Sequence, residues 1–332
     1  MSERATTTAT ATATTPATTT ATTPATTPAT TTIGLVSDTH FWPRNRPVIT
    51  SEGAIQLQPW SEQLLSTLIA ELEAAQVDLV IHLGDLTCGG GTYAMPPEEY
   101  VATMRTVHQR LQTLRAPVVA LSGNHDARPG DGDLSEFCDL WQNEAGLGKT
   151  IDLPQARLIL LNTTGYTPEQ VAAAPDGDPV YGWVSPAELD RLDAALATAG
   201  GRPVLLFTHQ LLQRWTGAQA WHDYFGVRNA ADVLQVIERR GGVRAVFQGH
   251  AHRFDLHTRP LGGEPNCLFA VMPAVIEYPV AWVRLQLSAT QAECTLQRLP
   301  LATIAAISEQ SGGGQGWRQG DPAWWSYQFS LA

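Results

Sequence analysis

Short apolar runs that alternate with helical segments constrain the fold of this chain more than any other feature. The runs cover residues 33–37, 79–84, 117–123, 156–162, 203–209 and 244–250. Each run is almost continuously apolar, which is typical of strands that are buried on both faces. Helical periodicity fills intervals between them, with helices expected from Ser61, Pro97, Ser185 and Asn229. We therefore expect an α/β fold in which helices cover buried sheets.

One of these helices has clear start and stop signals. Ser185 is expected to cap it, Pro186 to occupy its first position and Glu188 to complete a capping box. Gly200 and Gly201 then supply its end.

The two ends of the chain differ in composition from the main domain, which we place at residues 33–300. Residues 1–32 are almost entirely Thr, Ala and Pro, and we expect a disordered tail because such a segment buries little apolar surface. Beyond residue 264, apolar segments predict consecutive antiparallel strands joined by short turns. Residues 301–332 are expected to form a glycine-rich connector and an aromatic strap. The strap either packs on the domain or forms a subunit contact in a homo-oligomer.

The overall charge excludes some classes of partner. The formal charge of −11 over 332 residues argues against binding of long nucleic acid, which requires a basic surface. The four cysteines are far apart and form no Cys-x-x-Cys pair, so we expect reduced thiols in a cytoplasmic protein. No apolar run approaches the ~20 residues of a membrane-spanning helix, and we expect no membrane partner.

Polar side chains follow five of the apolar runs, at the point where each strand ends. They are Asp38, His40, Asp85, Asn124, His125, Asp126, His209, His250 and His252. In open α/β sheets, the carboxyl ends of strands are where loops converge on a ligand. Taken singly, Asp38 or Asp85 could cap a helix, and His209 could be a hydrogen-bonded core histidine. Their recurrence at five strand ends favours a shared site instead.

The chemistry of these side chains indicates metal binding. Asp, Asn and His without thiolate ligands suit divalent ions such as Mn, Fe or Zn. Residues two apart on an extended segment point to the same side, which groups Asp38 with His40 and His250 with His252. Seven of the residues are such ligands, more than the roughly three or four that one catalytic metal takes. We therefore expect two divalent ions that share a carboxylate.

In these motifs the sequence resembles the calcineurin-like metallophosphoesterase superfamily. The motifs are Asp-x-His at 38–40, Gly-Asp at 84–85, Gly-Asn-His-Asp at 123–126, a lone His at 209 and Gly-His-x-His at 249–252. The resemblance implies a four-layer α/β/β/α sandwich of two mixed β-sheets, with a dinuclear metal site at the carboxyl ends of the strands. It also implies a metal-dependent phosphoester hydrolase.

The resemblance assigns a role to each residue. One ion would be held by Asp38, His40 and His252, and the other by Asn124, His209 and His250, with Asp85 bridging the two. A hydroxide that bridges the ions would attack phosphorus in line. His125 would protonate the departing alkoxide, and Asp126 would orient its imidazole.

Departures from other relatives narrow the substrate. Serine/threonine protein phosphatases carry Gly-Asn-His-Glu, whereas the third motif here ends in Asp126. Purple acid phosphatases place a metal-bound Tyr where this chain has Cys88. The remaining resemblance, to the bacterial cyclic-nucleotide phosphodiesterase-like group (class III), predicts a phosphodiesterase on a small nucleotide-like substrate. Phosphomonoesterase or nucleotide pyrophosphatase activity is the alternative, and a non-catalytic binding scaffold is a remote one.

Residues in loops beside the motifs are candidates for substrate contact. Arg44, Arg46 and Arg128 could grip a phosphate, or they are solvated loop arginines. Trp215 and His222 could stack on a nucleobase. Core packing or a subunit contact explains these two aromatic residues equally well.

Overall fold

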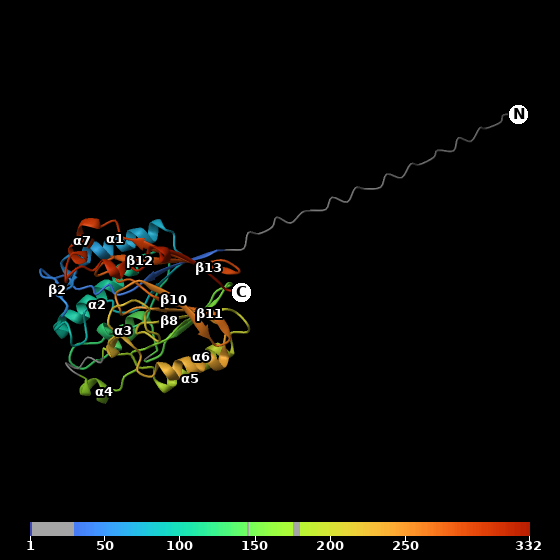
Figure 1. Ribbon diagram of the computed structural model, residues 1–332, viewed down its shortest axis with the longest axis horizontal. Coiled ribbons are helices and arrows are strands. Elements are labelled where there is room, and N and C mark those ends of the chain that lie inside the picture. The colour runs from blue at the N-terminus through green and yellow to red at the C-terminus, as the bar shows by residue number, and fades with distance from the viewer. Residues whose placement is uncertain (2–29, 145, 175–179) are drawn as a thin grey trace.

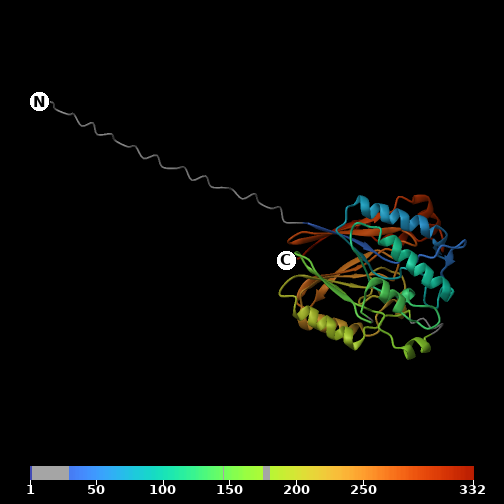
Figure 2. The same cartoon turned by 180° about the vertical axis from the view of Figure 1, so that it is seen from behind.

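The structure, a computed structural model, describes residue 1 and residues 30–144, 146–174 and 180–332. Within these ranges the chain forms two large sheets stacked face to face, with helices on the outer faces (Figure 1; Figure 2 shows the reverse side). The helices are α1 (Ser61–Ala74), α2 (Pro97–Leu111), α3 (Ser135–Trp141), α4 (Pro168–Ala173), α5 (Pro186–Ala197), α6 (Ala230–Arg240) and α7 (Ala302–Glu309). Helices α1 and α7 lie at one end of the stack in Figure 1, and α5 and α6 lie at the opposite end.

Both sheets are mixed. The first has the order β14-β13-β12-β1-β4-β5 and the second the order β10-β11-β9-β8-β7-β6. The first consists of β1 (Thr31–Val36), β4 (Leu79–His82), β5 (Val118–Ala120), β12 (Ala281–Leu287), β13 (Gln291–Arg298) and β14 (Ser326–Ser330). The second consists of β6 (Lys149–Asp152), β7 (Arg157–Leu160), β8 (Val204–Thr208), β9 (Val243–Gln248), β10 (Asp255–Leu261) and β11 (Glu264–Val271). A small ribbon pairs β2 (Val48–Ile49) with β3 (Ile55–Gln56).

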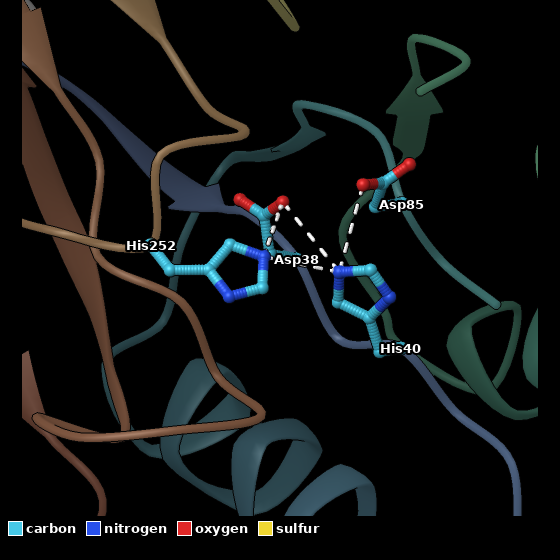
Figure 3. A group of neighbouring side chains, drawn as sticks. All are labelled: Asp38, His40, Asp85 and His252. Atoms are coloured by element: carbon cyan, nitrogen blue, oxygen red, sulfur yellow. Dashed lines mark hydrogen bonds and ion pairs between the residues drawn. The ribbon is translucent and has the colours of Figure 1, made fainter. Parts of the chain in front are cut away.

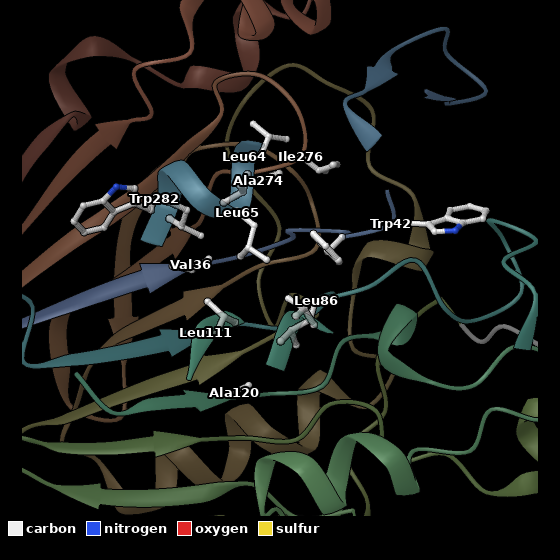
Figure 4. Close-up of a cluster of buried hydrophobic side chains, with 14 of the residues drawn as sticks. Val36, Trp42, Leu64, Leu65, Leu86, Leu111, Ala120, Ala274, Ile276 and Trp282 are labelled. Carbon is white, nitrogen blue, oxygen red and sulfur yellow. The ribbon is translucent and has the colours of Figure 1, made fainter. Parts of the chain in front are cut away.

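Three apolar layers separate the sheets and helices. Between the first sheet and α1 and α2, Val36 and Trp282 pack with Leu64 (Figure 4). Leu35 and Phe247 belong to the layer between the two sheets, and a third cluster lies between the second sheet and helices α5 and α6. Burial of this apolar surface is the main force that holds the layers together. The predicted four-layer α/β/β/α sandwich is therefore confirmed.

The strand directions bring distant loops to one place. Strands β1, β4 and β5 are parallel to one another, as are β8 and β9 in the second sheet. The amide of Asp38, after β1, donates to the carbonyl of Gly84, after β4, at 3.1 Å. Nδ1 of His209, after β8, lies 2.8 Å from the carbonyl of Leu83 in the other sheet. The loops that follow these strands are thus joined across both sheets.

The region after residue 264 differs from the predicted run of antiparallel strands. Strand β11 pairs in parallel with β9 and antiparallel with β10, which the sequence analysis missed. Strand β12 lies in the other sheet and pairs antiparallel with β1 and β13. The apolar pattern identified β11 and β12 as strands, but partner choice depends on the stacking of the two sheets, which short segments do not encode.

The chain ends also refine the predicted boundaries. Strand β1 begins at Thr31, two residues before the predicted start of the main domain, and residues 2–29 of the predicted tail lie outside the described residues. At the other end, α7 precedes the glycine-rich segment. The aromatic segment continues into β14, which pairs with β13 of the same chain, and Tyr327 and Phe329 pack on the layer between the sheets. The segment thus packs on the domain, which is the first of the two predicted alternatives.

The N-terminus of α5 confirms one half of the predicted capping box. The side chain of Ser185 accepts a hydrogen bond from the amide of Glu188 at 3.2 Å, as expected. The carboxylate of Glu188, however, turns inward and is fully buried. It accepts hydrogen bonds from the amides of Gly148 and Asn162 and pairs with Arg191 at 2.6 Å. Glu188 therefore ties α5 to the chain around β6 and β7.

We expect Glu188→Ala to lower the free energy of unfolding by about 3–5 kcal/mol, because it leaves Arg191 without its carboxylate partner and removes the acceptor of the buried Asn162 amide and the part-buried Gly148 amide. Asp190→Ala, at an exposed position on the same helix, should change it by less than about 0.5 kcal/mol. Urea unfolding followed by circular dichroism measures both. Equal stability of the two variants would contradict this role of Glu188.

Candidate metal centre

The predicted ligands lie on the loops that follow the strands, and several have unusual backbone conformations. Asp38, His40, Asp85, His250 and His252 have φ angles of 54°, 38°, 55°, 65° and 48°. Such left-handed values are uncommon for residues other than glycine and are concentrated at functional sites. The loops therefore accept strain in order to aim these side chains.

Four of these side chains form the first ligand group (Figure 3). Oδ1 of Asp38 lies 3.2 Å from Nε2 of His252 and 3.8 Å from Nε2 of His40. Nε2 of His40 lies 3.5 Å from Oδ2 of Asp85. Loops from both sheets thus bring their donor atoms to one point.

The second ligand group shares Asp85 with the first and adds His209 and His250. Nε2 of His209 lies 3.2 Å from Oδ2 of Asp85. Asn124 is buried and lies close to Asp85. The amide of His125, the next residue along the chain, donates to Oδ1 of Asp85 at 2.8 Å. The position of Asp85 in both groups is the one expected of a bridging carboxylate.

This donor set fits two divalent ions. Among the described residues, Oδ1 of Asp38 and Nε2 of His209 are buried without a hydrogen bond of good geometry, although each lies 3.2 Å from an oppositely charged group. Nε2 of His40 and Nε2 of His252 face each other at 3.1 Å beside carboxylate oxygens. Nitrogens and oxygens that converge in this way are arranged as ligands around a cation, and a set without thiolates suits Mn, Fe or Zn.

The pKa shifts of the carboxyl and imidazole groups indicate that both ligand groups attract cations. Burial alone would raise the pKa of Asp38, but His252 lowers it below its usual range. His209 likewise holds the pKa of Asp85 well below its usual range, against the effect of burial. In turn, although burial opposes it, Asp85 raises the pKa of His209 to about 9 and Asp38 raises that of His252 to about 10. Both carboxylates are therefore charged and attract cations.

A second contact fixes the orientation of three of the histidine rings. Nδ1 of His209 donates to the carbonyl of Leu83, as described above, which turns Nε2 toward Asp85. Nε2 of His250 donates to the carbonyl of Tyr224 at 3.0 Å, which leaves Nδ1 as the atom that could bind an ion. Nδ1 of His252 lies 2.9 Å from the carboxylate of Glu277. Such contacts select the tautomer that a metal ligand needs.

Glycines at two motifs allow the loops to approach closely. A Cβ at Gly123 would lie 2.1 Å from Oδ1 of Asp85, and one at Gly249 would lie 2.3 Å from Oγ of Ser37. Neither position has room for a side chain, because the backbone itself contacts the ligand loops. The glycines of Gly-Asn-His-Asp and Gly-His-x-His are therefore needed for space.

His125 lies beside the ligand groups, but its predicted support is different. Nδ1 of His125 donates to the carbonyl of Gly89 at 2.9 Å. The carboxylate of Asp126 instead accepts from the amides of Leu86, Thr87 and Gly123. The predicted role of Asp126 in orienting His125 is corrected accordingly: Asp126 fastens the third motif to the loop after β4. Burial, and then the charge of Asp85, raises the pKa of Asp126 to about 8.

A pocket of about 350 Å³ adjoins the two ligand groups. Its floor contains ligand residues and His125, and the predicted substrate residues Trp215 and His222 line its wall. His222 is stacked on Tyr224, with ring centroids 5.2 Å apart and an angle of 3° between the planes. The pair is exposed and presents a flat surface at the pocket.

The three predicted arginines lie elsewhere. In the described part of the chain, Arg44, Arg46 and Arg128 are not among the residues that line the pocket. Arg44 lies over the ring of Trp42 at 4.1 Å, and Arg46 is exposed. Arg128 is paired with Asp131 at the surface. Arg44 and Arg128 thus contact local partners, which their closeness to a motif along the chain did not predict.

Other residues at the pocket were missed by the sequence analysis. They include Tyr93, Arg253, Glu277, Trp317 and Arg318. Arg253 is buried between the rings of Trp215 and Trp317, at 4.5 Å and 5.2 Å, and burial lowers its pKa to about 10. Its place directly after the Gly-His-x-His motif was a usable signal. Glu277, Trp317 and Arg318 are far from every motif, and nothing local marked them.

Several curated proteins are similar to this chain. The glycerophosphodiester phosphodiesterase GpdQ of Enterobacter lignolyticus is 26% identical over 226 residues, which are 67% of this chain and 70% of that protein. A probable cyclic nucleotide phosphodiesterase of Rhodopseudomonas palustris is 28% identical over 223 residues, 66% of this chain and 70% of that protein. The 3′,5′-cyclic adenosine monophosphate phosphodiesterase CpdA of Escherichia coli K12 is 23% identical over 241 residues, with 72% and 76% covered.

The fold is similar to that of a dimetal phosphatase from Danio rerio, with a TM-score of 0.62 and 18% identity over 81% of this chain and 96% of that one. A family model described as calcineurin-like phosphoesterase matches residues 31–254, more than half of the chain, and the match contains every motif that carried the resemblance. The chain therefore belongs to the calcineurin-like phosphoesterase family.

Proposed function

We propose that this chain is a dinuclear phosphodiesterase that acts on a small, nucleotide-like substrate. The observation that carries the proposal is the pair of ligand groups that share Asp85 and open into one pocket beside His125. Names of the similar proteins support a diester substrate, since they include cyclic nucleotide and glycerophosphodiester phosphodiesterases. Phosphomonoesterase or nucleotide pyrophosphatase activity remains the alternative from the sequence.

Asp38, His40, Asp85 and His252 would hold one ion, and Asp85, Asn124, His209 and His250 the other. When bound, two such ions, which we propose to be Mn, Fe or Zn, activate water as a nucleophile and stabilise charge on the phosphoryl oxygens. The residues of the chain fix where that chemistry happens. The hydrogen bonds to Leu83, Tyr224 and Glu277 keep the ring planes in place before substrate binds.

His125 is proposed as the proton donor to the leaving group. Its Nδ1 proton is held by the carbonyl of Gly89, so the ring exchanges its other proton at Nε2. Its ring lies 5.2 Å from that of His40, which places it beside the first ligand group at the pocket. A donor in this place matters most for alkoxide leaving groups, which depart poorly without a proton.

The pocket wall is proposed to bind the part of the substrate that carries no reacting phosphoryl group. The stacked rings of His222 and Tyr224 can stack on a nucleobase. Arg253, between Trp215 and Trp317, supplies positive charge to the same wall. A glycerophosphodiester is the second candidate substrate, because the similar protein GpdQ is named for it. Such a substrate would contact the ligand groups but not the flat aromatic surface.

Two further proposals concern the setting of the enzyme. No helix among the described residues has the length and apolar character to cross a membrane. We propose a cytoplasmic location, which suits the unpaired state of the four cysteines. A homo-oligomer remains a proposal, although the aromatic C-terminal segment now has a partner within its own chain.

We expect Asp85→Asn to lose both ions, because the carboxylate belongs to both ligand groups. Metal analysis after dialysis against Mn²⁺ should give about two ions per wild-type chain and fewer than about 0.5 for the variant, and hydrolysis of bis(p-nitrophenyl) phosphate should fall at least about 10²-fold. Asp139→Asn, at an exposed position on α3, is the control. Full metal content in Asp85→Asn would contradict the bridging role.

His125→Asn should retain both ions but lower kcat for diesters with alkoxide leaving groups by about 10²–10⁴-fold. Diesters with a p-nitrophenol leaving group should be much less affected, because that anion departs without a proton. Comparison of kcat for the two classes, with metal content measured in parallel, tests the role. Loss of metal, or an equal effect on both classes, would exclude His125 as the proton donor.

His222→Ala should lower kcat/KM for cyclic nucleotides by about 5–150-fold, the value of stacking one base, and leave glycerophosphodiester hydrolysis unchanged. His222→Phe retains a flat ring and should restore most of the cyclic nucleotide activity. Steady-state kinetics with both substrates measure the difference. If both activities fall together, the aromatic surface does not recognise a base.

A further inference from the structure

The C-terminal segment of the chain reaches the metal centre. Residues 315–319, which include the 3₁₀ turn Gly316–Gln319, pack against the loop that carries His252, and the amide of Phe254 donates to the carbonyl of Arg318 at 2.7 Å. The family match ends at residue 254. The segment is therefore a feature of this chain that the shared motifs do not describe.

Arg318 makes several contacts at this point. Its Nη1 lies 2.8 Å from the carboxylate of Glu277 and donates to the carbonyl of His252 at 2.9 Å. Its Nε donates to the side chain of Gln315 at 2.8 Å. Arg318 is 7% exposed and Glu277 is 1% exposed, so each charge depends on the other for compensation. One guanidinium thus joins the C-terminal segment to Glu277 and to the backbone of a ligand residue.

Glu277, which Arg318 holds in place, in turn orients the imidazole of His252. Its Oε1 accepts the Nδ1 proton of His252 at 2.9 Å. With Nδ1 held by Glu277, Nε2 is directed at Oδ1 of Asp38, 3.2 Å away, which is where it would meet the first ion. Without the carboxylate, neither the tautomer nor the plane of the ring would be fixed. His252 belongs to the first ligand group alone, so the effect is confined to one of the two ions.

We propose that Glu277 and Arg318 are positioning residues of the metal centre, through which the C-terminal segment holds His252 ready to bind the first ion. The inference rests on the proposed function, since it assumes that the first ligand group binds a metal. Neither residue is a ligand. Their effect is on the affinity for the ion, and it is present before substrate binds.

The test compares Mn²⁺ binding to the full-length wild-type chain and to Glu277→Gln, Arg318→Met and the double variant. Isothermal titration without substrate gives the affinities, and elemental analysis after dialysis gives the metal content. Arg298→Met is the matched control, because Arg298 contacts Gln319 of the same segment but not Glu277 or His252. Circular dichroism and thermal unfolding of the metal-free proteins show whether each variant folds.

We expect each single variant to bind one Mn²⁺ about 10–100-fold more weakly and the other with wild-type affinity. The double variant should bind this ion no more weakly than the single variant with the lower affinity, because Arg318 acts on His252 through Glu277 and the two effects do not add. Saturating Mn²⁺ should restore kcat in Glu277→Gln, with KM unchanged. Arg298→Met should bind both ions as the wild type does.

Wild-type affinity for both ions in folded Glu277→Gln would overturn the inference and leave the proposed function intact. Equal weakening of both ions in Arg318→Met would also overturn it, since His252 serves only one group. A wild-type chain that bound no Mn²⁺ would overturn the proposed function and this inference together.

Discussion

The carboxylate of Asp85 is the constraint on which the rest of the site depends. It is buried between His40 at 3.5 Å and His209 at 3.2 Å, and Asp38 places a second buried negative charge close by. Two carboxylates at this depth are costly unless positive charge lies next to them. Imidazoles supply that charge only when protonated, whereas divalent ions supply it and leave the imidazoles neutral as ligands. The protonated histidines and the metal-bound state are thus alternative solutions to one electrostatic requirement.

The backbone around this carboxylate is held in a conformation that isolated loops would avoid. Left-handed φ values at five ligand residues cost of order 1–3 kcal/mol each, and they persist only where the surroundings determine them. Those surroundings are specific: the amide of His40 donates to the carbonyl of Asp85, and the amide of His250 donates to Oδ2 of Asp38. Gly123 lets a further loop approach Asp85 without a clash. The stacked sheets and these hydrogen bonds therefore hold the ligand geometry in place.

The positions of the proposed ligands were predictable because they depend on a short-range rule, whereas the residues that support them were not. Asp38, Asp85 and His209 each follow an apolar run, and parallel strands necessarily bring such positions together. The hydrogen-bond partner of His125 depends instead on the conformation of the folded loop. That partner is the backbone carbonyl of Gly89, not the predicted carboxylate of Asp126. The positive charge of loop arginines likewise did not predict substrate contact, since Arg128 pairs with Asp131 at the surface. Glu277 required knowledge of long-range packing that no local pattern contains.

The ligand loops and the pocket wall come from different parts of the chain, which affects how substrate preference can change without loss of metal binding. The ligand loops lie within residues 31–254, while one side of the pocket comes from the segment after β8 and another from the C-terminal segment. Within that last segment, Trp317 packs on Arg253 at the pocket while its neighbour Arg318 binds Glu277. Substitutions that reshape this wall would therefore also disturb His252. The backbone of Tyr224, on the aromatic side, holds the ring of His250 through its carbonyl. The exposed side chain of His222 lacks such a link, so substrate preference can vary there at less cost to metal binding.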